Sequence, residues 1–475
     1  MTIRDKGHRG ALRVGRPLLY DEPRARVSSW PPLRPARLRC ERESVVVVLS
    51  HPAPNIHLDG RTVMRIIGLD VSRSVAEIAY LEDGVLHAGG RAGLRRDELE
   101  RFAASLRSTD HVVLEATGNT AAIVNVLRPR VARVAIANPL LVRLIAEARV
   151  KTDKIDAAVL AQLYASHFLP EVWMPDESTL ALRRQVSRRS QLVRQRTRLK
   201  NEVHAVLAAN LIERCPATDL FGRKGRVWLM AQPLPMDERL GVEQRLRELD
   251  RLGEDLQEVD KALAQASIGD ERLRRLLTIT GVNTTVAIGL LSAIGAVERF
   301  PNPEKLVSYF GLNPSVYQSG PTPARHGHIT KRGRSYARAL LVEAAWGAAQ
   351  APGPLRAFFL RVRDRRGQQV AIVATARKLA VIVWYVLTRN EPFAWDRPAL
   401  TAHKLRALEL QSGMPAQHGS RKGSAAAYSL KSVRDQERAV AEQAERTYQR
   451  LFSRWKQARP NKREVPLVWP GTPIS

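Results

Sequence analysis

The feature that most constrains the fold is a series of short apolar runs between residues 64 and 150, separated by turn signals. Alternating and β-branched residues predict five strands: Arg65–Val71, Ala76–Glu82, Val85–Arg91, His111–Glu115 and Val131–Ala137. Helical periodicity predicts helices at Asp97–Leu106 and Ala121–Leu127, and a third helix beginning at Asn138-Pro139. This βββαβαβα order predicts an α/β domain with a mixed sheet covered by helices.

Four carboxylates occupy positions that such a sheet would bring together. Asp70 ends the first strand, Glu115 ends the fourth, and Asp153 and Asp156 begin a predicted helix on one of its faces. By fold analogy, this is the ribonuclease H-like (RuvC-like) order, in which acids from the first strand, the fourth strand and a later helix meet. Taken alone, an acid after an apolar strand is often a turn residue or a helix cap, and Asp153 fits the position of a cap. The complete set favours a site for Mg²⁺ or Mn²⁺ that cleaves phosphodiesters.

Charge and cysteine content point to a partner and a compartment. The 76 Lys and Arg residues exceed the 47 Asp and Glu residues, so the formal net charge is +29. This excess indicates a polyanionic partner, and nucleic acid is favoured over a membrane surface. The sequence is read as having no apolar stretch of about 18 residues, so no transmembrane helix is expected. Cys40 and Cys215 have no metal-ligand spacing and fit a reducing cytoplasm without disulfides.

Outside the α/β domain, the sequence predicts one arm at the N-terminus and a helical arm after residue 176. Residues 1–63 are rich in Arg and Pro and are interpreted as a disordered basic arm or as a mis-assigned start upstream of Met64. Residues 177–212 and 236–270 have apolar residues at helical or heptad spacing and predict a helical hairpin or coiled-coil arm. That arm either only spaces two domains or also joins subunits and contacts nucleic acid.

A second, mainly helical domain is predicted to begin near residue 271. Two short helices around Gly281 resemble a helix-hairpin-helix element, whose amides can meet phosphate. Further helices are predicted at Tyr336–Gln350 and Val370–Leu387, and residues after about 400 are expected to be loosely ordered. The predicted segments are therefore 1–63 (arm), 64–175 (α/β domain), 176–270 (helical arm), 271–395 (second domain) and 396–475 (polar tail).

Between the helices of the second domain lies a Pro- and Gly-rich basic loop. Its serines, Ser315 and Ser319, read most simply as turn residues, and composition ranks them equally as nucleophiles. The basic residues of the loop are interpreted as contacts to nucleic-acid phosphates: Arg325, Lys331, Arg332 and Arg334.

Six sequence pieces occur in the order found in one known family: Ile67–Ser72, Glu115–Gly118, Lys151–Ala157, Tyr309–Ser315, Gln318–Gly320 and Ile329–Gly333. They resemble the motifs of the IS110-type DEDD transposases, which include the Piv-like DNA invertases. The resemblance extends from Met64 to about Phe393 and covers both predicted domains.

The resemblance implies a catalytic arrangement. Asp70, Glu115, Asp153 and Asp156 would be the metal ligands of a RuvC-like domain, and Ser319, in Gln-Ser-Gly, would be the nucleophile of the second domain. It also implies that a structured guide RNA from the element's ends selects the DNA. Dimers or tetramers with sites shared between chains would carry out the reaction.

Two other functions remain open from the sequence. One is a RuvC-like metal-dependent nuclease that cuts branched DNA without a serine step. The other is a catalytically inactive protein that only binds nucleic acid. The complete acid set argues against the inactive protein.

Overall fold

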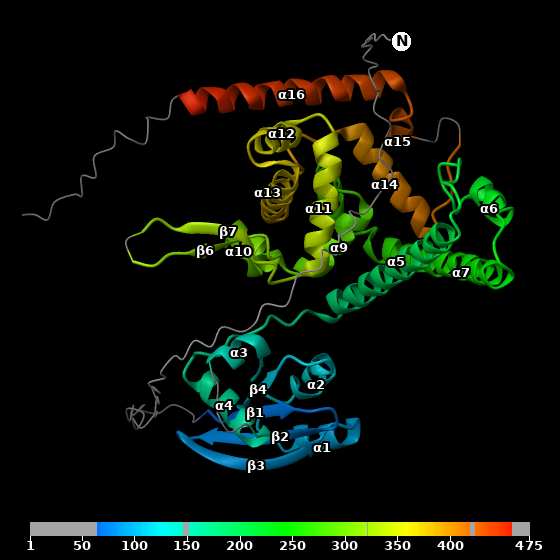
Figure 1. Cartoon of the computed structure of the whole chain (residues 1–475). Helices are drawn as coiled ribbons and strands as arrows, with labels where there is room; N and C mark the ends of the chain where they lie inside the picture. Colours follow the sequence, from blue (N-terminus) through cyan, green and yellow to red (C-terminus); the bar gives the residue numbers. More distant parts are fainter. Residues whose placement is uncertain (1–63, 146–151, 321, 419–422, 458–475) are drawn as a thin grey trace, which may run out of the picture.

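The computed structural model describes residues 64–145, 152–320, 322–418 and 423–457 (Figure 1). The predictions for residues 1–63, including Cys40, lie outside the described residues. The described part contains an α/β domain, a long helical hairpin and a second, mostly helical domain.

The α/β domain is built on a five-stranded mixed sheet. Its strands are β1 (Ile66–Val71), β2 (Val75–Glu82), β3 (Val85–Gly93), β4 (His111–Glu115) and β5 (Arg133–Ala137). They lie in the order β3-β2-β1-β4-β5. β1 pairs antiparallel to β2 and parallel to β4, and β4 pairs parallel to β5. The predicted mixed sheet is therefore confirmed, and the strand bounds differ from the prediction by two residues at most.

Helices cover both faces of this sheet: α1 (Arg96–Ala104), α2 (Thr120–Leu127), α3 (Pro139–Ile145) and α4 (Asp153–Ala165). Ile67 and Leu69 of β1 share a core with Leu99 of α1 and Ile123 of α2. Ile66 belongs instead to a second core that contains residues of α3 and α4. Because side chains alternate along a strand, Asp70 shares the α4 face with Ile66.

The helical hairpin consists of α5 (Glu177–Ala209) and α7 (Met236–Ser267), with α6 (Arg223–Met230) between them. Leucine and valine side chains of both long helices form one core, so the predicted hairpin is confirmed as an intramolecular one. Part of the arginine excess of α5 is neutralised within the hairpin, because Arg188 pairs with Asp255 at 3.2 Å. A role of the hairpin in joining subunits stays a prediction.

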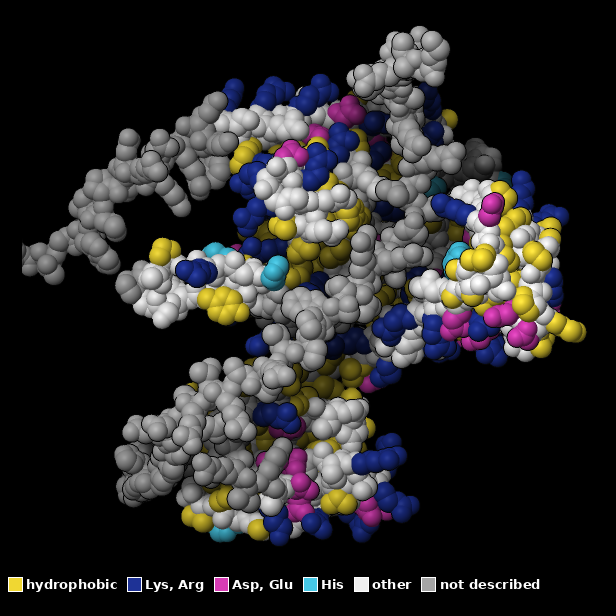
Figure 2. Space-filling view, in the orientation of Figure 1, with side chains coloured by type: hydrophobic (Ala, Val, Ile, Leu, Met, Phe, Trp, Pro, Cys, Tyr) yellow, Lys and Arg dark blue, Asp and Glu magenta, His cyan; other side chains and the backbone are white. Residues whose placement is uncertain are grey.

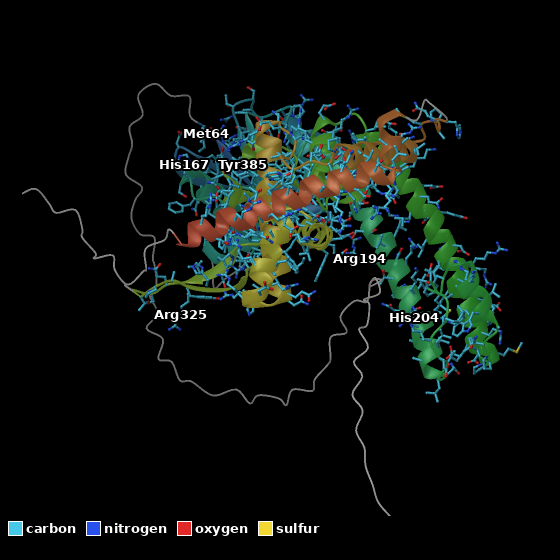
Figure 3. The ribbon with its side chains drawn as sticks, turned by 90° about the horizontal axis from the view of Figure 1, so that it is seen from above. Met64, His167, Arg194, His204, Arg325 and Tyr385 are labelled. Carbon is cyan, nitrogen blue, oxygen red and sulfur yellow. The ribbon has the colours of Figure 1, made fainter. Side chains whose placement is uncertain are left out.

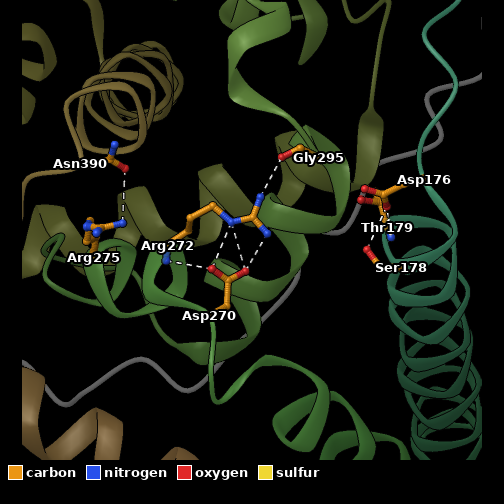
Figure 4. A network of polar contacts seen from close by, with 8 residues as sticks. All are labelled: Asp176, Ser178, Thr179, Asp270, Arg272, Arg275, Gly295 and Asn390. Atoms are coloured by element: carbon orange, nitrogen blue, oxygen red, sulfur yellow. Dashed lines mark hydrogen bonds and ion pairs between the residues drawn. The ribbon is translucent and has the colours of Figure 1, made fainter.

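The second domain packs helices around one large apolar core: α8 (Glu271–Leu277), α9 (Thr284–Ile294), a 3₁₀ turn (Val297–Arg299), α10 (Pro303–Tyr309), α11 (Ser335–Gln350), α12 (Pro354–Arg366) and α13 (Gln368–Arg389). Asp270 caps α8 and binds Arg272, whose Nη1 also donates to the Gly295 carbonyl (Figure 4). This network ties the start of α8 to the end of α9.

The turn between α8 and α9 is not an open phosphate-binding turn. A Cβ on Gly281 would lie 2.2 Å from the Ala344 carbonyl oxygen of α11, so the turn is pressed against that helix. The Lys404 Nζ donates to the Leu277 and Val282 carbonyls, at 2.8 Å each. The two predicted short helices are present as α8 and α9, and the turn between them is occupied by protein contacts.

Helix α13 corrects one expectation from the sequence. Its length and apolar composition would allow it to cross a membrane, and half of the apolar window is buried inside the protein. Ala376, Leu379 and Val383 lie fully inside the core of the second domain. The core of this domain accounts for the apolar composition of α13.

The region after residue 396 is more ordered than expected. It contains α14 (Pro398–Ser412), the short α15 (Gly423–Ala427) and the long α16 (Lys431–Gln457). α16 crosses the outside of the second domain next to α12 (Figure 1). The expectation of loose order failed because it relied on polar composition, whereas α16 is held by a few specific contacts described below.

Candidate active site

The acidic site begins with the pairing of β1 and β4. Ile66 lies opposite His111, and Leu69 lies opposite Leu114. One residue further on, Asp70 and Glu115 are therefore side by side at the carboxyl ends of two parallel strands. Both belong to the face that carries α4.

A buried ion pair fixes this register at the other end of the strands. The Arg65 guanidinium donates to both carboxylate oxygens of Asp110, at 2.9 and 2.6 Å, and Asp110 is fully buried. The hydrogen bond to Asp110 raises the pKa of Arg65, so this guanidinium stays charged. Because a slip of one residue would turn every side chain to the other face, this pair also fixes where Asp70 points.

Helix α4 lies unusually close to the sheet because β1 has a glycine beneath it. A Cβ on Gly68 would lie 1.9 Å from the Ala157 carbonyl oxygen. The Thr152 hydroxyl caps the helix by accepting from the Ile155 N–H. Asp153 is therefore the first residue of α4, one turn before Ala157, and Asp156 lies within the same first turn.

The direction of α4 brings its acidic end to the acidic ends of the strands. Near the start of β4, the His111 ring is hydrogen-bonded to the Tyr164 hydroxyl at 2.8 Å. From His111 to Glu115 the strand rises about 13 Å. From Tyr164 back to Asp153 the helix covers roughly 16 Å in the same direction. Asp153 consequently lies at the edge of the sheet where Glu115 ends.

The predicted ligands thus come from elements that converge, but the side chains do not close around one point. Within the described ranges, no three His, Cys, Asp or Glu side chains are arranged to hold a metal ion. The donor set itself fits a hard divalent cation, because all four groups are carboxylates. The identity of the ion stays a prediction.

A fifth carboxylate, which was not predicted from the sequence, lies next to the four. Glu77 of β2 pairs in register with Asp70 and is only 5% exposed. It forms an ion pair with Arg91 of β3. The pairing of β1 with β2 places Glu77 opposite Asp70, at a position that faces inward. That pairing is the signal that could have revealed Glu77.

The predicted basic loop of the second domain is a β-hairpin. Strands β6 (Pro314–Tyr317) and β7 (Arg325–Ile329) pair antiparallel and project from the helical body (Figure 1). In Figure 3, the hairpin is located by the label of Arg325. It lies on the opposite side of the molecule from His204 of α5. The interpretation of residues 325–329 as a loop is therefore wrong, and the glycines and proline in this stretch explain why the strands were missed.

The two candidate serines have different surroundings. The Ser315 hydroxyl donates to the His328 carbonyl at 3.2 Å and lies over Gly327. Ser319 is exposed in the connection between the strands, where Gly320 has a φ of +59°. Its hydroxyl makes no hydrogen bond to any described residue, while its carbonyl accepts from Thr322 at 2.7 Å. Of the two candidate serines, Ser319 thus has the more accessible hydroxyl.

The four predicted phosphate contacts are exposed and lie on or just after β7: Arg325, Lys331, Arg332 and Arg334. Arg334 also reaches inward, since its Nε donates to the Tyr309 hydroxyl at 2.9 Å. Burial raises the pKa of Tyr309, but the nearby Arg334, Arg299 and Arg183 outweigh burial, and the pKa is lowered.

These arginines join the second domain to the segment that leaves the α/β domain. The Arg299 guanidinium lies 4.4 Å from the centre of the Trp173 ring. Arg183 donates to the Ser292 and Ala293 carbonyls, at 2.7 and 2.9 Å, and these carbonyls end helix α9. The cluster therefore holds the base of the hairpin to the domain junction.

Comparison with known proteins agrees with these two domains. Residues 67–210 match the transposase model for the DEDD domain of IS110 elements. Residues 273–360 match the model described as the Transposase IS116/IS110/IS902 family. The two matches correspond to the sheet domain with its following helix and to the first part of the second domain.

Individual relatives cover much of the chain. A "Probable family 20 transposase" of Pseudomonas aeruginosa is 29% identical over 68% of this chain and 97% of its own length. The "Transposase for insertion sequence element IS1111A" of Coxiella burnetii is 28% identical over 51% of this chain and 68% of its own length.

A "Pilin gene-inverting protein" of Moraxella bovis is 26% identical over 60% of this chain and 82% of its own length. Transposases and a DNA-inverting protein are thus similar to this chain over half or more of its length. The chain belongs to the IS110 family of transposases.

Proposed function

We propose that this transposase cuts and rejoins the DNA of an insertion sequence through a covalent link to Ser319, assisted by the four carboxylates of the α/β domain. The observation that carries this proposal is the contrast between the two serines. Ser319 is exposed and its hydroxyl is unbonded among the described residues, whereas the Ser315 hydroxyl is held within the hairpin.

In the proposed reaction, the Ser319 Oγ attacks the phosphorus of a DNA phosphodiester. One P–O bond to deoxyribose breaks as the serine ester forms, and the leaving oxygen takes up a proton and becomes a strand hydroxyl. The serine proton passes to a base or to water. Because one ester replaces another, a hydroxyl of the exchanging strand can reverse the reaction without a high-energy cofactor.

Two sets of residues would support this step. The cations of the hairpin would neutralise the charge that develops on phosphorus: Arg325, Lys331, Arg332 and Arg334. The four carboxylates would hold Mg²⁺ or Mn²⁺, which when bound supplies Lewis-acid stabilisation of a phosphate. Their oxygen ligands and their convergence at one sheet edge support this assignment.

The proposed partners are nucleic acids, suggested by the positive charge, and further copies of the chain, suggested by the separation of Ser319 from the carboxylates. The net charge of +29 suits binding of the element's DNA and of a structured guide RNA, in the cytoplasm near the nucleoid. Ser319 and the carboxylates lie in different domains of the chain (Figure 1). We therefore propose a dimer or tetramer in which Ser319 of one chain meets the carboxylates of another.

The experiment that tests this function is an adduct assay. The full chain is mixed with Mg²⁺, RNA transcribed from the element's flanks and labelled DNA that carries the excised-element junction. We expect a denaturation-resistant protein–DNA adduct with the wild type and Ser315→Ala, and none with Ser319→Ala or Asp153→Ala. Free cut ends that survive Ser319→Ala would replace this proposal with a metal-dependent nuclease.

A further inference from the structure

Helix α16 lies outside both matched family domains, which end at residue 360, yet it is attached to the second domain by specific contacts. Glu445 is 5% exposed and accepts hydrogen bonds from Arg356 at 3.0 Å and from the Gly353 backbone N–H at 3.1 Å. Further along, the Arg361 guanidinium lies 3.7 Å from the centre of the Phe452 ring. Residue numbers rise together in these contacts, so α16 runs parallel to α12.

The two halves of α16 differ in charge. In the first half, arginine and acid alternate, and Arg438 pairs with Glu442 at 3.0 Å. From residue 446 to residue 457 the sequence has no acidic residue. Arg446, Arg450 and Arg454 follow one another at intervals of four, so they share one side of the helix and span about 12 Å.

This arginine row is exposed and makes no ion pair with any residue that the structure describes. Arg446 only approaches the Glu442 backbone carbonyl, at 3.4 Å. Gln449 and Ser453 lie on the same open side of the helix as the three arginines. A structural role would require partners, as Glu445 has, and the row lacks them.

The neighbouring end of α12 adds to the positive charge. Arg363, Arg365 and Arg366 are exposed there, and Asp364 is the only acid in that stretch. Because α12 and α16 are parallel, the basic end of α12 adjoins the basic half of α16. Figure 2 shows Lys and Arg side chains along the outer edge of α16.

The basic half of α16 also lies on the functional side of the domain. Figures 1 and 3 both place the C-terminal end of α16 on the side from which the β6–β7 hairpin projects. A nucleic acid held at Ser319 could therefore continue towards the arginine row.

We propose that Arg446, Arg450 and Arg454 of α16 bind the phosphate backbone of duplex DNA outside the segment held by the hairpin. This inference rests on the proposed function for the choice of DNA as the partner. A duplex carries one charge per roughly 1.7 Å of its axis, so about 12 Å of duplex carries roughly seven phosphates over both strands. The contact is independent of sequence, since it involves only the backbone.

The test compares two triple variants of the full chain. Arg446→Gln, Arg450→Gln and Arg454→Gln together remove the row. Arg95→Gln, Arg96→Gln and Arg101→Gln remove three other exposed charges at and within α1, where Arg96 and Arg101 pair with acids of the same helix. Helix α1 covers the sheet face away from the acidic site. Fluorescence anisotropy with labelled junction duplex, measured over a series of salt concentrations, gives the affinity and its salt dependence.

We expect the α16 variant to bind duplex roughly tenfold more weakly and to reduce the slope of log K against log salt by about 3. The α1 variant should leave the slope within about 1 of the wild type. Replacing the row with three lysines should restore the slope, because it depends on charge. Circular dichroism should show an unchanged helix content in every variant.

An unchanged slope in the α16 variant would overturn this inference, whether or not the Ser319 adduct forms. A slope change confined to an RNA duplex of the same sequence would overturn it as well. Loss of duplex binding in a protein that forms no adduct would support the α16 contact and contradict only the serine chemistry, so the two proposals fail separately.

Discussion

The acidic site and the serine hairpin differ in how the chain holds them. The carboxylates stand on β1, β4 and α4, whose relative positions are fixed by a buried ion pair, a hydrogen bond and a close contact at Gly68. Ser319 stands in an exposed connection whose position depends on a two-stranded ribbon. All four proposed metal ligands therefore come from one rigid domain, whereas the proposed nucleophile lies in an exposed connection that no such contacts hold.

The largest expected effects separate metal binding from covalent chemistry. Asp153→Asn should lower the rate of DNA cleavage on the order of a thousandfold, because charge stabilisation by a metal contributes several kcal/mol. It should also weaken Mn²⁺ binding, measured by calorimetry. Ser319→Ala should abolish the adduct but leave Mn²⁺ affinity unchanged, since the hairpin contributes no carboxylate to the site.

Weaker Mn²⁺ binding by Ser319→Ala in the protein without DNA would contradict this separation of metal binding from covalent chemistry. That outcome would mean that the hairpin already forms part of the metal site. Ser315→Ala is the matched control, because it removes a hydroxyl from the same hairpin.

The next effect concerns the close approach of α4 to β1. Gly68→Ala should lower the free energy of unfolding by about 3 kcal/mol, because its methyl group meets the Ala157 backbone, which cannot move independently. Gly118→Ala is the control, since a Cβ there meets nothing within 4 Å. Thermal and urea unfolding followed by circular dichroism would measure both. Equal stability of the two variants would contradict the packing of α4 on Gly68.

The sequence predicts the first region better than the second, for physical reasons. Strand alternation and helix periodicity place Asp70, Glu115 and Asp153 correctly, because burial of one face imposes those patterns. The β6–β7 hairpin is exposed on both faces and rich in glycine and proline, so no such pattern marks it.

Two further features depend on contacts between distant parts of the chain. Glu77 becomes notable only once β2 is paired with β1 and lies beside Asp70. α16 is polar in composition, and its attachment depends on Glu445 meeting Arg356, 89 positions away. Periodicity within a segment cannot reveal such pairings.

The third prediction tests whether Glu77 positions the acidic site. Glu77→Gln should weaken Mn²⁺ binding by about 10- to 100-fold, because a buried group beside a ligand orients that ligand. Glu82→Gln, at the other end of β2, should leave the affinity unchanged. Calorimetric Mn²⁺ titration at one pH measures both variants. Unchanged Mn²⁺ affinity in Glu77→Gln would restrict the site to the four predicted carboxylates.

The smallest expected effect is a pH dependence of the free energy of unfolding, confined to the helical second domain. Burial lowers the pKa of Lys404 from 10.5 to about 8. Between these values the unfolded chain holds a proton that the folded protein has released, so the free energy of unfolding rises with pH. The two carbonyl hydrogen bonds favour the charged form and keep this gain below what burial alone would give.

Lys404→Met removes the titrating group, so the wild type should gain stability relative to this variant from pH 8 to pH 10.5. Hydrogen exchange should locate the gain in α8 and α9, whose turn Lys404 contacts, and leave β4 unaffected. A gain that also appears in β4 would mean that the two regions unfold as one unit. The acidic domain and the helical domain would then not differ in how they unfold. They would differ only in how the chain holds their two candidate sites.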